Sequence, residues 1–204
     1  MGIRAIAAGL VLAAFSTVLA TAAPALDLGA SLPLATHPMV DPDGRRHSVG
    51  EVVGEKGTLV LFLCVHCPWV QSWSGRIAAI GEIAARKGIG VIALNSNDPS
   101  RVKLDGVAGM RRQIAEFHFP FPYVVDRGST MARAFAAKRT PEAYLFGPAG
   151  HLAYRGTIDD DAYDSQGVES RFLLDAVRAV AAGKVPDPAQ TKALGCAMKM
   201  YPAE

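Results

Sequence analysis

The feature that most limits the possible fold is an apolar run that ends in two closely spaced cysteines. Residues 58–65 form a continuous apolar segment of strand length, and the motif Cys64-Val65-His66-Cys67 lies at its end. Such a run is typical of a strand that is buried on both faces of a sheet. Over residues 68–87 apolar side chains then recur at helical spacing, and Gly88 supplies a stop. We therefore expect a buried strand, a two-cysteine loop and a helix that begins at the motif.

The rest of the chain alternates strand and helix patterns around this unit. A turn signal at 41–44 indicates a small hairpin, and a short helical turn is expected over 49–53. Further on, the patterns predict strands at 89–94 and 121–125, helices at 107–117, 131–137 and 170–182, and a hairpin formed by 143–146 and 152–154. This order predicts an α/β fold: a central mixed sheet with parallel core strands, an antiparallel edge hairpin and helices on both faces.

The N-terminal segment differs from the rest of the chain. Arg4 precedes an apolar run over 6–20, and small residues follow at 20–22, which is the pattern of a secretory signal with its cleavage site. We expect residues 1–22 to be a signal peptide, 23–183 one domain and 184–204 a C-terminal tail that runs over the surface. The mature protein would be exported to the periplasm, and it would touch a membrane only through an uncleaved signal segment.

Composition excludes several function classes. The net charge is only +2 at pH 7, so no nucleic-acid partner is expected. Half of the residues are hydrophobic, enough for a core that needs no disulfide staples. The chain has only three cysteines, at positions 64, 67 and 196. In an exported protein these can form disulfides, so their chemistry matters more than their packing.

The CxxC spacing at a helix start predicts thiol–disulfide exchange. The free amides and the positive dipole end of a helix stabilise a thiolate. We expect Cys64 to be the exposed attacking thiol and Cys67 to be the more buried resolving thiol. His66 lies between them, where an imidazole favours the thiolate, although it could also be merely an exposed residue at a helix start. A zinc site is not expected, because no second cysteine or histidine pair completes four ligands, and no other cofactor is expected.

Several segments carry a resemblance to a known family. Beside the CxxC motif they are VIALN (91–95), FPFPY (119–123), RTPE (139–142), YRGTIDD (154–160) and GCAMK (195–199). Together these segments resemble the thioredoxin-like fold proteins of the redoxin and alkyl-hydroperoxide-reductase type. The resemblance implies an enzyme that exchanges with protein thiols or disulfides and is reloaded by a redox partner protein. It also implies that Thr140 and Pro141 form the substrate-binding loop, in which a cis-proline faces the active-site sulfurs.

Four questions stay open at this level. A peroxiredoxin-like peroxide reductase is an alternative, but Gly57 and Leu61 stand where peroxiredoxins carry the proline and threonine that precede their reactive cysteine. A second alternative is a protein that holds Cu(I) through Cys64, Cys67 and a histidine. The proton acceptor for Cys67 is not identifiable. Cys196 is either idle, paired between molecules or able to exchange with the motif.

Overall fold

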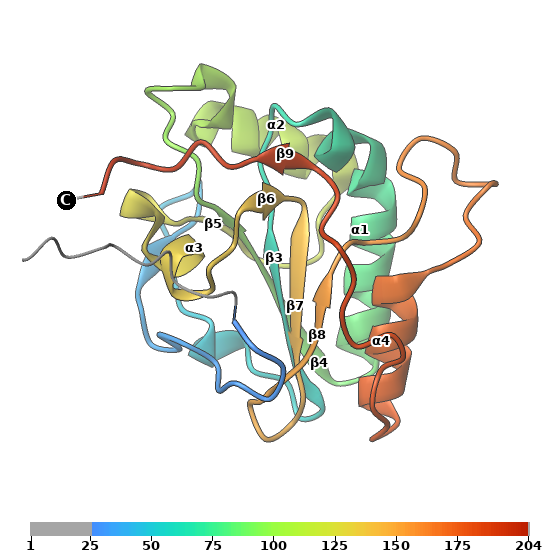
Figure 1. Cartoon of the computed structure of the whole chain (residues 1–204). Coiled ribbons are helices and arrows are strands. Elements are labelled where there is room, and N and C mark those ends of the chain that lie inside the picture. The colour runs from blue at the N-terminus through green and yellow to red at the C-terminus, as the bar shows by residue number, and fades with distance from the viewer. Residues whose placement is uncertain (1–25, 204) are drawn as a thin grey trace, which may run out of the picture.

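The expected buried strand lies in the middle of a seven-stranded mixed sheet in the computed structural model, which describes residues 26–203. The strand order is β2-β1-β5-β4-β3-β7-β8 (Figure 1). Its strands are β1 (Met39–Val40), β2 (Arg46–His47), β3 (Gly57–Phe62), β4 (Ile89–Asn95), β5 (Tyr123–Val125), β7 (Glu142–Phe146) and β8 (Leu152–Gly156). The central strands β3, β4 and β5 are parallel, as expected, and β7 and β8 form an antiparallel hairpin beside β3.

Helices cover both faces of this sheet. The helices are α1 (Pro68–Arg86), α2 (Val107–Phe117), α3 (Thr130–Ala134) and α4 (Phe172–Ala181), with short 3-10 turns η1 (Gly50–Val52), η2 (Lys103–Asp105) and η3 (Arg127–Ser129). Residues from α1, α2 and α4 belong to one core cluster, and residues from α3 belong to the other (Figure 1). The predicted fold class is confirmed by this arrangement.

Strand β3 explains why the apolar run had to be continuous. Leu59 and Leu61 belong to the core cluster under α1, whereas Val60 and Phe62 belong to the cluster that includes α3. All four are completely buried. Because successive side chains of a strand point to opposite faces, a strand with a core on each side needs apolar residues at every position.

Two expectations about the edges and ends of the fold need correction. The hairpin of β1 and β2 joins the sheet through an antiparallel pair between β1 and β5, so both edges of the sheet are antiparallel. The tail does not simply run over the surface: β9 (Cys196–Ala197) pairs with β6 (Arg139–Thr140) in a separate two-stranded sheet. The expected signal peptide, 1–22, lies outside the described residues.

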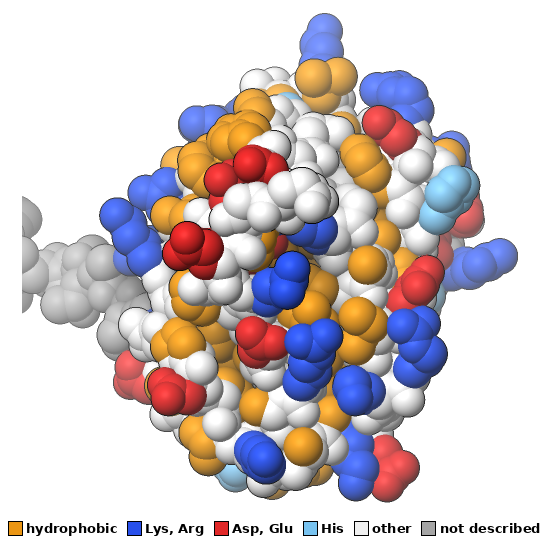
Figure 2. Space-filling view, turned by 90° about the vertical axis from the view of Figure 1, so that its right-hand side faces the viewer, with side chains coloured by type: hydrophobic (Ala, Val, Ile, Leu, Met, Phe, Trp, Pro, Cys, Tyr) orange, Lys and Arg blue, Asp and Glu red, His pale blue; other side chains and the backbone are white. Residues whose placement is uncertain are grey.

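The surface carries mixed charges. On the face shown in Figure 2, acidic and basic side chains are interspersed with apolar ones.

Across residues 26–203, the structure contains no helix with the length and apolar character that crossing a bilayer requires.

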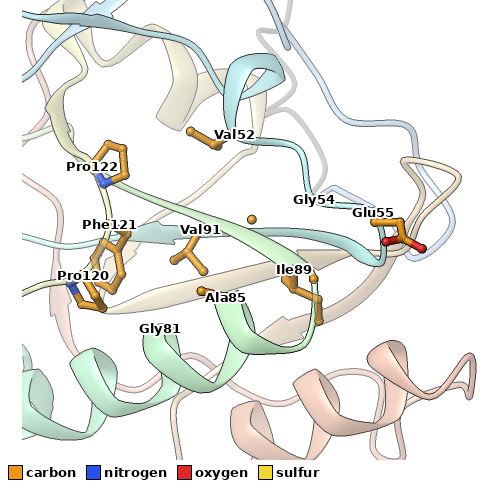
Figure 3. A pocket seen from close by; sticks show the side chains of 12 residues that line it. Val52, Gly54, Glu55, Gly81, Ala85, Ile89, Val91, Pro120, Phe121 and Pro122 are labelled. Carbon is orange, nitrogen blue, oxygen red and sulfur yellow. The ribbon is translucent and has the colours of Figure 1, made fainter.

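One surface cavity lies at the end of the sheet opposite the cysteines. It has a volume of about 350 Å³ and is lined by residues that include Gly81 of α1, Ile89 and Val91 at the start of β4, and Phe121 just before β5 (Figure 3). These residues mark the amino ends of the parallel strands. Since no cysteine or histidine lines this cavity, it is not part of the redox site.

Close backbone packing at the same end of β4 leads to a stability prediction. A Cβ atom at Gly90 would lie 1.5 Å from the carbonyl oxygen of Val52 and 2.9 Å from the amide nitrogen of Gly54. Gly90→Ala should therefore lower the free energy of unfolding by about 1–3 kcal/mol, the usual cost of overpacking. Gly75→Ala is the control, because Gly75 lies in α1 with open space around it and should gain about 0.5–1 kcal/mol. Urea unfolding measures both, and an unchanged midpoint for Gly90→Ala would contradict this reading.

Candidate active site

The CxxC motif lies between the carboxyl end of β3 and the start of α1. Cys67 is the N-cap residue of α1 with an extended backbone, and Pro68 occupies the first turn. Proline suits this position because the amide it lacks would have no partner within the helix. The side-chain amide of Gln71 donates to the carbonyl oxygen of Val65 over 2.6 Å and so ties the first turn back to the motif.

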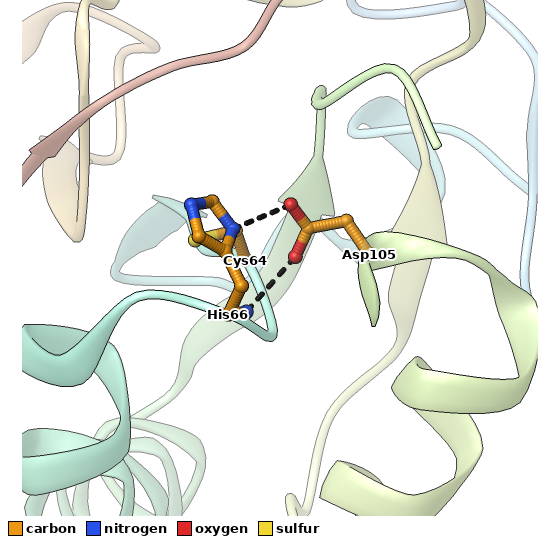
Figure 4. A group of neighbouring side chains, drawn as sticks. All are labelled: Cys64, His66 and Asp105. Carbon is orange, nitrogen blue, oxygen red and sulfur yellow. Dashed lines mark hydrogen bonds and ion pairs between the residues drawn. The ribbon is translucent and has the colours of Figure 1, made fainter. Parts of the chain in front are cut away.

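A buried carboxylate, Asp105, organises the motif from the other side. Its Oδ1 accepts hydrogen bonds from the backbone amides of Val65 (2.7 Å) and His66 (3.0 Å). Its Oδ2 accepts from Nδ1 of His66 over 2.6 Å and from the side-chain amide of Asn97 over 2.8 Å (Figure 4). Four donors thus converge on one carboxylate that is only 3% exposed. This carboxylate fixes both the loop between the cysteines and the imidazole that the loop carries.

His66 is held beside Cys64 by this contact. One ring nitrogen of His66, the Sγ atom of Cys64 and a carboxylate oxygen of Asp105 all lie within 4.8 Å of one another. Because a carboxylate can only accept, Nδ1 of His66 is the donor in this contact. His66 therefore lies beside Cys64 and is held there by a carboxylate that the sequence did not reveal.

The expected substrate-binding loop faces the two sulfurs. The Thr140–Pro141 bond is cis. The Oγ1 atom of Thr140 lies 3.0 Å from Sγ of Cys64, and Sγ of Cys67 lies 3.1 Å from the carbonyl oxygen of the same threonine. One residue thus touches both cysteines, although it follows them by more than seventy positions.

The expected difference in exposure between the two cysteines is wrong. Cys64 and Cys67 are both 0% exposed, because the Thr140 loop covers both sulfurs and the tail covers Cys67. All three cysteines are free thiols in this structure. A molecule from outside therefore reaches Cys64 only when part of this cover moves.

The two buried thiols ionise as a coupled pair. A hydrogen bond from the Cys64 thiol lowers the pKa of Cys67 to about 5, and contacts with the Cys196 thiol and with the backbone amides of Val70 and Cys196 act in the same direction. The same bond to Cys67, together with burial and the charge of Asp105, raises the pKa of Cys64. The pair thus releases its first proton easily and keeps the second. Cys67 is the better-stabilised thiolate in the reduced protein, whereas the sequence placed this charge on Cys64.

Two polar atoms near the motif have no hydrogen-bond partner within the described part of the chain. They are Oε1 of Gln113, whose Nε2 donates to the carbonyl oxygen of Cys64 over 3.3 Å, and the hydroxyl of Tyr123. Burial raises the pKa of Tyr123, and the charges of Cys64 and Asp105 raise it further. Because buried polar groups are nearly always paired, these two atoms give the site spare hydrogen-bonding capacity.

The two tryptophans beside the motif have separate roles. Trp73 is completely buried, and its indole nitrogen donates to Asp159 over 2.6 Å. Trp69 is only partly buried and stacks at a tilt on both Trp73 and Tyr163, with ring centroids 5.5 and 5.4 Å apart. Tyr163 is 66% exposed. Trp69 and Tyr163 therefore offer an aromatic surface beside the motif, while Trp73 belongs to the core.

Asp105 and Asn97 are the site residues that the sequence analysis missed. A signal for Asn97 existed: the polar segment 95–98 begins at the last residue of β4, and the carboxyl ends of neighbouring parallel strands meet at one edge, where ligands commonly bind. Asp105 carried no comparable signal, since it lies in a loop after that segment. Its place depends on the contacts that η2 makes with α2 and with Asn95, whose side-chain amide donates to the carbonyl oxygen of Asp105 over 2.8 Å.

Cys64, His66 and Asp105 offer three metal-ligating atoms at short range. The contacts around them do not suit a metal ion. Each carboxylate oxygen of Asp105 already accepts two hydrogen bonds, and Nδ1 of His66 donates one of the two that reach Oδ2. A cation would have to replace these bonds and release the motif loop. The arrangement suits a charge network that acts on a thiol better than it suits an ion site.

The contact between His66 and Asp105 makes a prediction about thiol ionisation. In His66→Ala the charge of Asp105 would act on Cys64 without a neighbouring donor, so the pKa of Cys64 should rise further, by about one unit or 1.36 kcal/mol. The pair should become more reducing, because its thiolate form is less stable. Ultraviolet thiolate absorbance against pH measures the shift, with His151→Ala at an exposed turn as the control. An identical titration in both variants would exclude a role for His66.

Comparison with known proteins places this geometry in a family. The family model described as Redoxin matches residues 27–182. No curated protein matches the chain. Among solved structures, an uncharacterized conserved protein from Geobacillus kaustophilus is 27% identical with a TM-score of 0.79, covering 88% of this chain and 95% of its own.

Two structures with described activities share the fold alone. A secreted disulfide oxidoreductase from Mycobacterium tuberculosis is 12% identical with a TM-score of 0.53, over 72% of this chain and 95% of its own. The bacterioferritin comigratory protein of Xanthomonas campestris, studied for alkyl peroxide reduction, is 18% identical with a TM-score of 0.56, over 76% of this chain and 99% of its own. With the family match spanning most of its length, this chain belongs to the redoxin family of thioredoxin-fold redox proteins.

Proposed function

We propose that this protein is an exported thiol–disulfide oxidoreductase that exchanges a Cys64–Cys67 disulfide with protein thiols. The observation that carries the proposal is the contact of one residue, Thr140, with both sulfurs at the start of α1. Exchange needs two thiols within reach of each other, one of them easily ionised. The ionisation of Cys67 supports the second requirement, because the neighbouring Cys64 thiol lowers the pKa of Cys67 to about 5.

The chemistry of one cycle follows from this arrangement. A thiolate of the pair attacks a client disulfide, and one client sulfur leaves as a thiolate. The second thiol of the pair then attacks the mixed disulfide, which frees the reduced client and leaves Cys64 and Cys67 joined. Oxidation of a client dithiol is the same sequence in reverse, and the potential of the pair decides which direction dominates.

A redox titration and an insulin assay test the proposal together. After equilibration in glutathione buffers and acid quenching, peptide mapping should show a two-electron couple that joins Cys64 and Cys67. With dithiothreitol as reductant, the full chain should accelerate insulin reduction. Hydrogen peroxide consumption is measured in parallel, because a peroxide reductase is the competing function. Rapid peroxide turnover without insulin reduction would replace the proposal with that function.

Export is a separate part of the proposal and has its own test. The charged start, apolar run and small residues over 1–22 support it. When the full chain is expressed in a Gram-negative host, it should appear in the periplasmic fraction with an intact mass that begins at Ala23. A cytoplasmic chain of full length would contradict export without affecting the exchange chemistry.

A further inference from the structure

The C-terminal tail lies directly on the redox pair. Strand β9 pairs antiparallel with β6, with Cys196 opposite Thr140 and Ala197 opposite Arg139 (Figure 1). Thr140 is the residue that touches both motif sulfurs. The backbone position that an extended client segment would use next to Pro141 is therefore filled by the chain itself.

Cys196 contacts Cys67 from this strand. The strand pairing sets Cys196 opposite Thr140, and the carbonyl oxygen of Thr140 accepts from Sγ of Cys67 over 3.1 Å. Cys64 lowers the pKa of Cys67, and the nearby Cys196 lowers it as well. Within the described residues, the group of three ligating side chains that lie within 4.8 Å of one another contains Cys64 but neither of the other two cysteines. The three thiols are thus arranged as a row with Cys67 in the middle, rather than as a closed three-sulfur metal site.

The tail is held in this place by contacts on both sides of Cys196. The guanidinium of Arg139 donates to the carbonyl oxygen of Gly195 over 2.7 Å, and the amide of Met198 donates to the carbonyl oxygen of Lys138 over 3.0 Å. Further along, the amide of Lys199 donates to Oδ1 of Asn97 over 2.7 Å. Asn97 also donates to Asp105, so the tail is tied to the network that holds the motif.

We propose that Cys196 is a third redox-active thiol, which takes over the disulfide from the buried pair and presents it at the surface to the redox partner. The inference rests on the proposed exchange function of Cys64 and Cys67. In the step itself, the Cys196 thiolate attacks Sγ of Cys67 in the Cys64–Cys67 disulfide. A Cys67–Cys196 bond forms, the Cys64–Cys67 bond breaks, and Cys64 leaves as a thiolate that takes up the proton lost by Cys196. No external oxidant is needed for this transfer.

Exposure and charge give the transfer its direction. Cys64 and Cys67 are completely buried, whereas Cys196 is partly exposed, so a reductant reaches the second disulfide more easily than the first. In the reduced protein, burial and the neighbouring Cys67 raise the pKa of Cys196 to about 11, while the charges of Lys199 and Arg139 lower it. The contribution of the Cys67 charge disappears once Cys67 is part of a disulfide, so Cys196 ionises more easily when it is needed.

The first test isolates Cys67 and Cys196. In Cys64→Ser only Cys67 and Cys196 remain, and oxidised glutathione should convert them to an intramolecular disulfide through a Cys196 adduct. Peptide mapping after acid quenching detects this bond, and wild-type protein with limiting oxidant should show both Cys64–Cys67 and Cys67–Cys196 linkages. Finding only glutathione adducts in Cys64→Ser, together with only Cys64–Cys67 in wild type, would overturn the inference but leave the proposed function intact. Failure of Cys64–Cys67 to form at all would overturn the proposed function.

The second test moves the tail without touching a sulfur. A Cβ atom at Gly195 would lie 2.2 Å from the carbonyl oxygen of Thr140, so Gly195→Ala must displace β9. The Cys67–Cys196 fraction should fall about tenfold, which equals a loss of about 1.4 kcal/mol, while Cys64–Cys67 forms as in wild type. Gly183→Ala is the matched control, because Gly183 also has a positive φ but has open space around it. Equal Cys67–Cys196 fractions in the two variants would overturn the role of the tail.

Discussion

Replacing Cys64 by serine should abolish exchange with protein disulfides, with a loss on the order of a thousandfold or more, as expected when the group that forms the covalent intermediate is removed. The comparison is sharpest in a Cys196→Ser background, because Cys196 contacts Cys67 and could otherwise replace the missing thiol. Insulin reduction measures the loss. Full activity of the Cys64→Ser, Cys196→Ser chain would remove Cys64 from the mechanism.

Trapping then decides which sulfur attacks the client. The sequence predicts that Cys64 attacks, so a Cys67→Ser, Cys196→Ser chain should accumulate mixed disulfides with its clients. The structure stabilises the thiolate of Cys67 instead, and the reciprocal Cys64→Ser, Cys196→Ser chain tests whether that thiolate can also attack. Adducts found only in the reciprocal chain would reverse the two roles. Non-reducing electrophoresis followed by mass spectrometry identifies the linked cysteine.

Asp105→Asn should shift the whole pH profile of the reaction to lower pH. The pKa of Cys64 is raised by its bond to Cys67 and by burial, and also by the negative charge of Asp105. Removing that charge should lower the pKa by about one unit, or 1.36 kcal/mol. The Cys64 thiolate, and the reaction steps in which Cys64 attacks, would then appear at lower pH. Since a more stable thiolate favours the dithiol form, the reduction potential should rise by about 30 mV for each 1.4 kcal/mol.

The same variant also tests the hydrogen bonds of the Asp105 side chain separately from its negative charge. Asparagine can still accept hydrogen bonds from the amides of Val65 and His66 through its oxygen, but its NH₂ group can accept neither from Asn97 nor from Nδ1 of His66. The free energy of unfolding should therefore fall by about 1–3 kcal/mol for the buried amide of Asn97 that is left unpaired, and by a further amount for the imidazole. Asp98→Asn is the control, because Asp98 lies on the same loop and its side chain accepts from the amide of Ser100. If Asp105→Asn loses stability but the pH dependence of its activity is unchanged, Asp105 has only a structural role.

Local sequence patterns were enough to predict the core of the fold and the position of the two-cysteine motif. The run before Cys64, the helical spacing after Cys67 and the glycine at position 88 are local patterns, and local patterns report directly whether a segment is buried on one face or two. They predicted β3, α1 and the motif between them correctly. The TPE segment around Pro141 was found through family resemblance, and its residue Thr140 does lie on the sulfurs.

The surroundings of those sulfurs depend on segments that come together only in the folded chain. Asp105 reaches the motif because the carboxyl ends of β3 and β4 lie side by side, and a single acidic residue in a loop has no periodicity that would reveal this. Strand β9 is two residues long, too short for an alternating pattern, and it forms because the backbone of Thr140 offers free hydrogen-bonding groups beside the site. Long-range contacts of this kind depend on where separate segments meet in space. They therefore set the ionisation and burial of the cysteines, which local sequence patterns could not predict.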